Sequence, residues 1–252
     1  LTFLSSNTST GNEQKAPIIN YKTRFLPEIG KNGMVVGPEK LAAEIGLSIL
    51  KDGGNAIDAA VATGFALAVT YPRAGNLGGG GFMLIHRQNE NQQTLIDYRE
   101  TAPLGAQSDM FLDESGKVDR SRIYFSHLAA GVPGTVAGLL MALEQYGTLP
   151  IDVVIKPAIK LALEGFPVSY ALNYEINSRA KRLAENPEAA KLFLTSEKSA
   201  PPIGSIFKQG ELANTLMRIS KEGHDGFYRG LTAKFITDEM DSAGGLITTR
   251  DL

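Results

Sequence analysis

The sequence contains no cysteine and no tryptophan, and it has no long hydrophobic run. The absence of cysteine excludes disulfide bridges, thiolate zinc sites and a cysteine nucleophile, and it is compatible with export from the cell. A membrane-spanning helix needs about 18 or more apolar residues. The longest apolar stretch, residues 56–69, is shorter than this and is interrupted by Asp58.

Charge of neither sign dominates the chain. The 25 Lys and Arg residues are interleaved with 27 Asp and Glu residues, which gives a formal net charge of −2. A nucleic-acid-binding domain usually shows a basic patch, so we expect no nucleic-acid partner. The 252 residues, of which 43% are hydrophobic, suffice for one large domain or two small ones with a sizeable core.

The chain is expected to divide into an arm and a domain. Residues 1–30 are polar, with Asn, Ser, Thr, Gly and Lys interleaved, and we expect them to form a flexible N-terminal arm. Residues 31–252 are expected to form the folded part. The first residue is not Met, and the start is compatible with either the remnant of a signal peptide or a trimmed chain.

The first folded segments are predicted to be a strand and two helices. Residues 34–36 form a short β-type run, and Pro38 lies where the first turn of a helix tolerates proline. Asn55 is predicted to cap the second helix, with Asp58 near its positive end. That helix is apolar on nearly every face, which is typical of a buried helix. The helices are expected at residues 38–51 and 56–70.

Two β-type runs then predict a hairpin, in which alternate side chains point to opposite faces. Apolar residues fall on both faces, so we expect a sheet that is covered on both sides. Asp97 shares a face with Arg99, two residues away, and is predicted to orient its side chain. The strands are expected at residues 82–87 and 94–99, around a polar loop at residues 88–93.

The second half of the chain is predicted to be largely helical. Apolar residues recur there with helical spacing, and glycines mark the ends of the segments. The expected fold class is therefore α/β (α+β), rich in helix. The predicted helices cover residues 135–146, 153–163, 170–185, 211–222 and 232–242.

Arg99 is the residue most suggestive of a binding site. It lies at the end of a predicted strand and opens the segment Arg99-Glu100-Thr101-Ala102-Pro103, in which the proline stops the extended chain. A planar guanidinium held in such a position can bind a carboxylate through two parallel hydrogen bonds. A lone arginine is also commonly part of a surface or structural ion pair, and both roles remain open from the residues alone.

The glycine cluster, residues 78–81, invites comparison with a phosphate-binding loop. It lacks the Gly-Lys-Ser/Thr ending and leads into a strand, so the helix N-terminus that would bind phosphate is missing. A tight backbone passage beside a neighbouring element or a ligand is favoured instead.

The histidines give no sign of a metal or catalytic site. His86, His127 and His224 are widely spaced and match no metal-ligand pattern. Ser126 precedes His127 directly, and neighbouring side chains on an extended chain point apart, so these two are not expected to form a nucleophile–base pair.

A series of short motifs follows in a fixed order along the chain. These are Gly53-Gly54-Asn55-Ala56-Ile57-Asp58-Ala59-Ala60-Val61-Ala62, Gly78-Gly79-Gly80-Gly81-Phe82, Arg99-Glu100-Thr101-Ala102-Pro103, Val132-Pro133-Gly134, Gly226-Phe227-Tyr228-Arg229-Gly230 and Gly244-Gly245-Leu246-Ile247-Thr248-Thr249-Arg250-Asp251-Leu252. Together they resemble the N-terminal, large-subunit part of the γ-glutamyltranspeptidases (glutathione hydrolases). The resemblance runs from about Gly33 to the last residue.

The resemblance implies an N-terminal-nucleophile hydrolase with a four-layer α-β-β-α sandwich, of which this chain supplies the large-subunit portion. Such a precursor cleaves itself, and the new N-terminal threonine of the small subunit is the nucleophile, with its α-amine as base. The implied donors are glutathione and other γ-glutamyl compounds, and the acceptors are water, amino acids or peptides. The small subunit is the implied protein partner. No metal or organic cofactor is expected, and the implied location is periplasmic or secreted.

The resemblance assigns one binding residue to this chain. Arg99 is implied to bind the α-carboxylate of the γ-glutamyl group. No catalytic residue is expected here: the family's nucleophile follows a longer stretch of chain, which rules out Thr248 and Thr249. The chain is thus expected to be a large subunit truncated at its C-terminus and inactive alone. A related cephalosporin or glutaryl acylase is an alternative, because a glutaryl carboxylate can use the same clamp, and a non-catalytic binding or structural half-fold is another.

Overall fold

A computed structural model describes residues 28–252 of the chain. Residues 34–252 form one compact unit, referred to below as the second unit because the division of the chain falls after residue 33, and it carries the features described below. Most of the predicted arm, residues 1–30, lies outside the described residues. No helix within residues 28–252 is long and apolar enough to cross a membrane.

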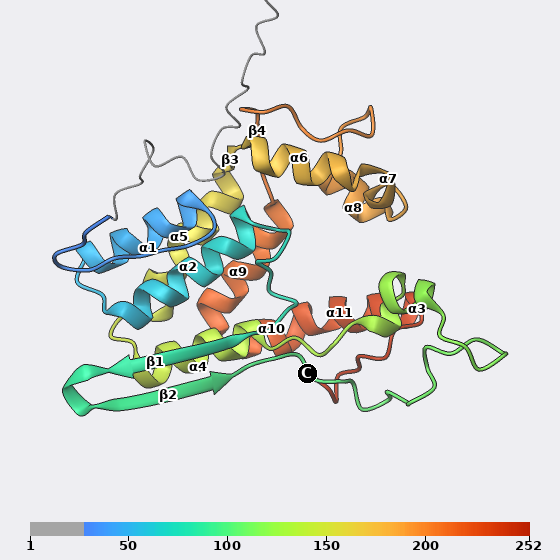
Figure 1. Ribbon diagram of the computed structural model, residues 1–252, viewed down its shortest axis with the longest axis horizontal. Helices are drawn as coiled ribbons and strands as arrows, with labels where there is room; N and C mark the ends of the chain where they lie inside the picture. Colours follow the sequence, from blue (N-terminus) through green and yellow to red (C-terminus); the bar gives the residue numbers. More distant parts are fainter. Residues whose placement is uncertain (1–27) are drawn as a thin grey trace, which may run out of the picture. The chain divides into compact units, whose positions relative to one another are not determined.

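Helix α2 occupies the centre of the second unit (Figure 1). It packs against α1, α4 and α5, and α5 in turn packs against α9. Its burial agrees with the apolar character that the sequence gives to nearly every face of this helix. The bounds are α1 (Lys40–Lys51), α2 (Ala56–Thr70), α4 (Thr135–Tyr146), α5 (Ile151–Glu164) and α9 (Gly210–Glu222).

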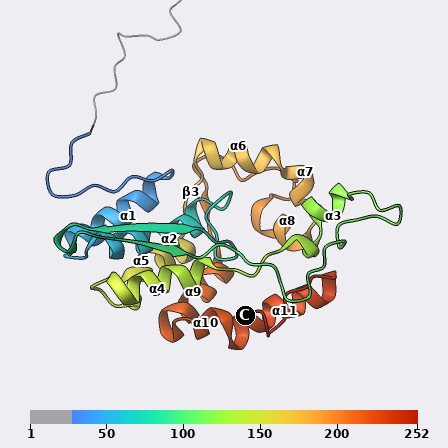
Figure 2. The same cartoon turned by 60° about the horizontal axis from the view of Figure 1, so that its bottom comes forward.

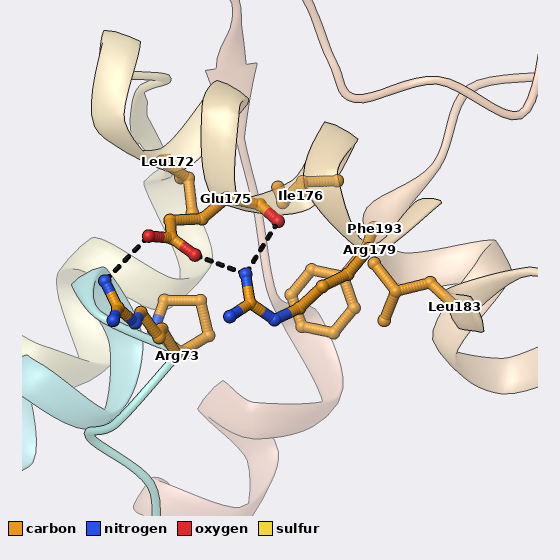
Figure 3. Close-up of a pocket in the computed structure, with 8 residues that line it drawn as sticks. Arg73, Leu172, Glu175, Ile176, Arg179, Leu183 and Phe193 are labelled. Carbon is orange, nitrogen blue, oxygen red and sulfur yellow. Dashed lines mark hydrogen bonds and ion pairs between the residues drawn. The ribbon is translucent and has the colours of Figure 1, made fainter. Parts of the chain in front are cut away.

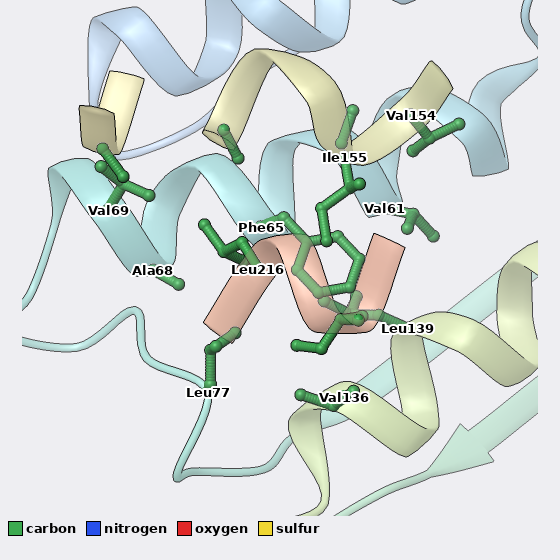
Figure 4. Packing of buried hydrophobic residues seen from close by; sticks show 14 of the residues in the cluster. Val61, Phe65, Ala68, Val69, Leu77, Val136, Leu139, Val154, Ile155 and Leu216 are labelled. Atoms are coloured by element: carbon green, nitrogen blue, oxygen red, sulfur yellow. The ribbon is translucent and has the colours of Figure 1, made fainter. Parts of the chain in front are cut away.

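The hydrophobic core forms where these helices meet. Phe65 of α2 is fully buried, and around it gather Leu139 of α4, Ile155 of α5 and Leu216 of α9 (Figure 4). Burying side chains of this size contributes roughly 1.5–3 kcal/mol each. The core therefore fixes four helices from both halves of the sequence as one unit.

Helix α2 begins with a reciprocal cap that extends into a tertiary contact. The Asn55 side chain accepts hydrogen bonds from the N–H groups of Ile57 and Asp58, and the Asp58 carboxylate accepts from the Asn55 N–H at 2.7 Å. The same carboxylate accepts from the Thr148 hydroxyl at 2.6 Å and from the N–H groups of Thr148 and Leu149 at 2.9 and 3.2 Å. One carboxylate thus caps a helix and anchors the α4–α5 loop.

Strands β1 (Phe82–Arg87) and β2 (Gln92–Asp97) form an antiparallel hairpin beside α4 (Figures 1 and 2). Ile85 and Ile96 point to the covered face and are buried, whereas Leu84 and Leu95 are 73% and 63% exposed on the other. The prediction that both faces are covered is therefore wrong for residues 28–252, because helices pack against one face only.

Three other predictions about local structure are corrected. Residues 34–36 form no strand, since no other described segment pairs with them. Helix α1 begins at Lys40, two residues after Pro38, because Glu39 caps it by accepting the Ala42 N–H at 3.1 Å. The helix predicted over residues 170–185 is split at Arg179, whose φ of −119° and ψ of 5° are not helical.

The remaining elements surround this core, and several of them were not predicted. The chain forms α6 (Tyr170–Ser178), α7 (Ala180–Leu183) and α8 (Pro187–Phe193), and α10 and α11 follow α9 (Figure 2). A second two-stranded antiparallel sheet, β3–β4, flanks the α6–α8 region in sequence. The other bounds are η1 (Gln88–Glu90), α3 (Arg120–Phe125), η2 (His127–Ala129), β3 (Phe166–Pro167), β4 (Ile206–Phe207), α10 (Asp225–Tyr228) and α11 (Gly230–Ala243).

Candidate functional site

The segment that begins at Arg99 leaves β2 and passes between two glycine-containing stretches. One is the glycine cluster, residues 78–81, and the other is residues 131–134. The Val132 N–H donates to the Thr101 carbonyl at 2.8 Å, and the Gly134 N–H donates to the Gly79 carbonyl at 2.8 Å. These bonds hold the three segments side by side.

The approach of these segments is too close for larger residues. A Cβ atom added at Gly80 would lie 2.4 Å from the Tyr98 carbonyl oxygen, and one added at Gly134 would lie 2.0 Å from the same atom. Both distances are far below van der Waals contact, and the obstacle is backbone. The tight backbone passage predicted for the glycine cluster is therefore confirmed.

A hollow of about 430 Å³ opens beside this crossing. Arg99 and Glu100 supply its charged groups, Thr101 its hydroxyl, and the rest of its surface is apolar side chain or backbone. Its volume lies within the range of small-molecule sites. The lining comprises Gly78, residues 99–103, Ala106, Met110, Phe111 and residues 128–131.

The Arg99 guanidinium is fixed through its Nε, whereas its terminal nitrogens are available to a ligand. Its Nε donates to Glu100 Oε2 at 3.1 Å, and its Cζ lies 5.9 Å from the centre of the Phe82 ring. The side chain is 62% exposed, and within residues 28–252 neither terminal nitrogen has a hydrogen-bond acceptor. The terminal N–H groups can therefore receive a carboxylate from a ligand.

The predicted role of Asp97 is corrected by these contacts. Its carboxylate accepts the backbone N–H of Arg99 at 3.0 Å and does not contact the guanidinium. Glu100 orients the guanidinium instead, and the sequence reasoning missed it. Alternation along the predicted strand 94–99 put Asp97 and Arg99 on one face, but β2 ends at Asp97, so alternation no longer governs Arg99.

The last residues of the chain fix the far end of the same segment. Asp251 accepts the Leu104 N–H at 2.7 Å, and its other oxygen accepts the N–H and hydroxyl of Thr248. Burial raises the pKa of Asp251, but these hydrogen bonds and the nearby Arg250 outweigh it, so the net pKa is lowered. A charged Asp251 thus anchors the chain directly after Pro103. The sequence offered a signal for this turn in its Thr-x-x-Asp spacing.

Tyr228 fixes the stretch of residues 131–134, of which Gly131 lines the hollow. Its hydroxyl donates to the Pro133 carbonyl at 2.8 Å and accepts the Ala137 N–H at 3.1 Å. Burial is the main influence on the pKa of Tyr228 and raises it, although the Ala137 hydrogen bond opposes this. The neutral phenol therefore serves as both donor and acceptor, and it joins residues 131–134 to the start of α4.

The other side chains considered from the sequence lie in separate places. Ser126 donates to the Arg122 carbonyl, while His127 pairs with Glu239 at 2.9 Å, so they do not act on each other. His86 contacts Gln88. Within residues 28–252, no three His, Cys, Asp or Glu side chains are grouped as metal ligands would be.

The chemistry of the hollow is that of an anion-binding site. The described lining contains no histidine, lysine or aspartate, and its one glutamate is paired with Arg99. A nucleophile would have no general base among these residues. The lining of the hollow therefore offers a cation, Arg99, that can hold an anionic group.

A family profile and individual relatives both identify the same protein family. The family profile described as gamma-glutamyltranspeptidase matches residues 42–252. The chain is 47% identical over 240 residues to the glutathione hydrolase proenzyme of Escherichia coli (strain K12), covering 94% of this chain and 41% of that protein. The chain thus spans less than half the length of that relative.

Solved structures share the fold. The crystal structure of Helicobacter pylori gamma-glutamyltranspeptidase superposes with a TM-score of 0.87 at 43% identity, covering 90% of this chain and 64% of that one. A cephalosporin acylase from Bacillus halodurans matches with a TM-score of 0.80 at 29% identity, covering 96% of this chain and 45% of that one. The helix-rich α/β arrangement is therefore that of a large-subunit portion.

Proposed function

Because this chain belongs to the γ-glutamyltranspeptidase family, we propose that the complete protein cleaves the γ-glutamyl amide bond of glutathione and related compounds. The glutamyl group then passes to water or to an amino acid or peptide acceptor. The observation that supports a role for this chain is the Arg99 guanidinium at the edge of the hollow, with its terminal N–H groups available. In this proposal it binds the α-carboxylate of the γ-glutamyl group.

The proposal divides the reaction between two parts of the protein. Arg99 holds the donor in place, so that the scissile amide is presented to a nucleophilic threonine outside these 252 residues. That threonine begins the small subunit, which is the proposed partner. Support comes from the open face of the hairpin, where Phe82, Leu84 and Leu95 are 57%, 73% and 63% exposed. An apolar face of this kind is typical of a surface that another segment covers.

The test uses the complete protein and γ-glutamyl-p-nitroanilide. Arg99→Lys is expected to raise KM with little change in kcat, because an ammonium cannot reproduce the two-point contact of a guanidinium. A charge-assisted pair contributes about 1.5–3 kcal/mol, which corresponds to about 10- to 150-fold in kcat/KM. Arg120→Lys is the matched control, because Arg120 is exposed and lies outside the lining of the hollow. Unchanged kinetics for Arg99→Lys would refute the assignment.

The similarity to a cephalosporin acylase supports a second candidate reaction, the hydrolysis of a glutaryl amide. Glutaryl-p-nitroanilide has the same remote carboxylate as the γ-glutamyl compound but lacks the α-amine. If the protein is a glutaryl acylase, it should hydrolyse glutaryl-p-nitroanilide at least as fast as γ-glutamyl-p-nitroanilide. If it is a γ-glutamyltranspeptidase, it should hydrolyse the γ-glutamyl compound much faster. If the complete protein turns over neither compound, a non-catalytic binding or structural role is supported.

We also propose that the complete protein is periplasmic or secreted. The composition, which includes no cysteine, is compatible with an oxidising compartment. Fractionation of cells that express the complete protein tests this directly, and recovery of the activity with a cytoplasmic marker enzyme would refute it.

A further inference from the structure

A second cavity lies away from Arg99, between α6, α7, α8 and the turn after α2 (Figure 3). It has a volume of about 320 Å³ and shares no lining residue with the hollow beside Arg99. Its apolar lining comes from Leu172 and Ile176 of α6, together with Pro72, Leu183 and Phe193. A cavity of this size suits a small molecule with an apolar body.

The charged groups of this cavity are two arginines that share one carboxylate. Arg73 Nη1 donates to Glu175 Oε1 at 2.7 Å, and Arg179 pairs with the other carboxylate oxygen (Figure 3). The three charged lining residues thus carry a net charge of +1. The Arg73 and Arg179 side chains are 53% and 52% exposed, while Glu175 is 22% exposed. Each guanidinium has five N–H donors, so donors remain for an additional anion.

We propose that this cavity binds a small organic carboxylate with a short hydrocarbon or single-ring body. The carboxylate is received by the guanidiniums of Arg73 and Arg179, and the apolar body packs against Leu172, Ile176 and Phe193. This cavity is separate from the hollow beside Arg99, because the two have no lining residue in common.

The first experiment compares probes that differ in charge. Binding of hexanoate and of 1-hexanol to the complete protein is measured by saturation-transfer NMR and calorimetry. Hexanoate is expected to bind at a single saturable site about two- to fivefold more tightly than 1-hexanol, a range typical of a charge contact at a half-exposed site. No saturable binding of hexanoate, or equal binding of the two probes, would overturn the proposal.

The second experiment uses variants with opposite expected effects. Arg179→Gln removes a cation and is expected to weaken hexanoate binding about two- to fivefold, whereas Glu175→Gln removes the competing carboxylate and is expected to tighten it. If the cluster were only structural, both changes would break the same ion pairs and act in the same direction, which would refute the proposal. Lys181→Gln, outside the lining, is the control for net charge, and Arg73→Gln replaces Arg179→Gln if that variant fails to fold.

Discussion

Two single charges in this chain, Asp58 and Arg99, have opposite surroundings. Asp58 is fully buried, and its carboxylate accepts four hydrogen bonds from Asn55, Thr148 and Leu149. Arg99 is 62% exposed, and among residues 28–252 it forms one ion pair, with Glu100. A buried charge that is fully satisfied by its own chain stabilises the fold, whereas an exposed cation with donors to spare can bind a ligand. The comparison predicts that Asp58 variants lose stability and Arg99 variants lose substrate affinity.

The largest expected effect is the loss of stability in Asp58→Asn. The amide keeps one acceptor oxygen but presents N–H donors in place of the other, so the part-buried Asn55 N–H loses its acceptor and the hydrogen bonds from Thr148 and Leu149 lose the charge that strengthens them. An unsatisfied donor costs about 1–3 kcal/mol and the lost charge adds to this, so we expect a total of about 3 kcal/mol or more. The measurement is the urea midpoint of the complete protein. Asp52→Asn, at an exposed position, should change the free energy of unfolding by no more than about 0.5 kcal/mol.

The next effect is the dissociation of affinity from stability in Arg99→Lys. The increase in KM should come with a change in unfolding free energy of no more than about 1 kcal/mol, because the ion pair that Arg99 forms with Glu100 is an exposed one. Urea unfolding and kinetics of the same preparation check this together. A large loss of stability would show that Arg99, like Asp58, is a structural residue, and it would contradict the proposed difference between the two.

A third prediction concerns the stability of the protein at low pH. Burial raises the pKa of Asp58, but the hydrogen bonds from Thr148, Asn55 and Leu149 outweigh it, and the net pKa is lowered. Folding therefore favours the charged form: its contribution is complete above the unfolded pKa of about 4 and is lost as the pH falls through the lower folded pKa. The melting temperature, measured from pH 7 to pH 3, should fall less steeply at the acid end in Asp58→Asn than in the unmodified protein. Parallel curves would contradict this.

The smallest expected effect is at Glu100. Glu100→Ala removes the acceptor of the Arg99 Nε–H and should raise KM about two- to fivefold, as expected for an exposed pair. Glu100→Gln keeps an acceptor oxygen and removes a carboxylate that competes for the guanidinium, so its KM should return to the value of the unmodified protein or fall below it. The readout is KM for γ-glutamyl-p-nitroanilide. If the Gln variant behaves like the Ala variant, charge rather than orientation explains the contribution of Glu100.

Predictions from local patterns succeeded where the neighbours in sequence are also the neighbours in space. Helix α2 follows from its Asn55 cap and its apolar composition, and helix α4 has the bounds that its spacing predicted. The close approach of backbone segments at residues 78–81 was also predictable, because glycine has no Cβ that would prevent it. Helix α8 was missed, although Asn186 caps it and Pro187 occupies its first position, a local signal that was available.

The family, the helix-rich fold class and a strand close before Arg99 were all predictable from the sequence, although β2 ends at Asp97 and not at the predicted residue 99. The contacts of each charged group became visible in the folded structure alone. Asp58 meets Thr148 across 90 residues, and Asp251 meets Leu104 across 147. It also decided which face of the hairpin is buried, because alternation gives two apolar faces and only packing against α4 distinguishes them. Local patterns report backbone preference and polarity, whereas these contacts depend on which distant segments the folded chain brings together.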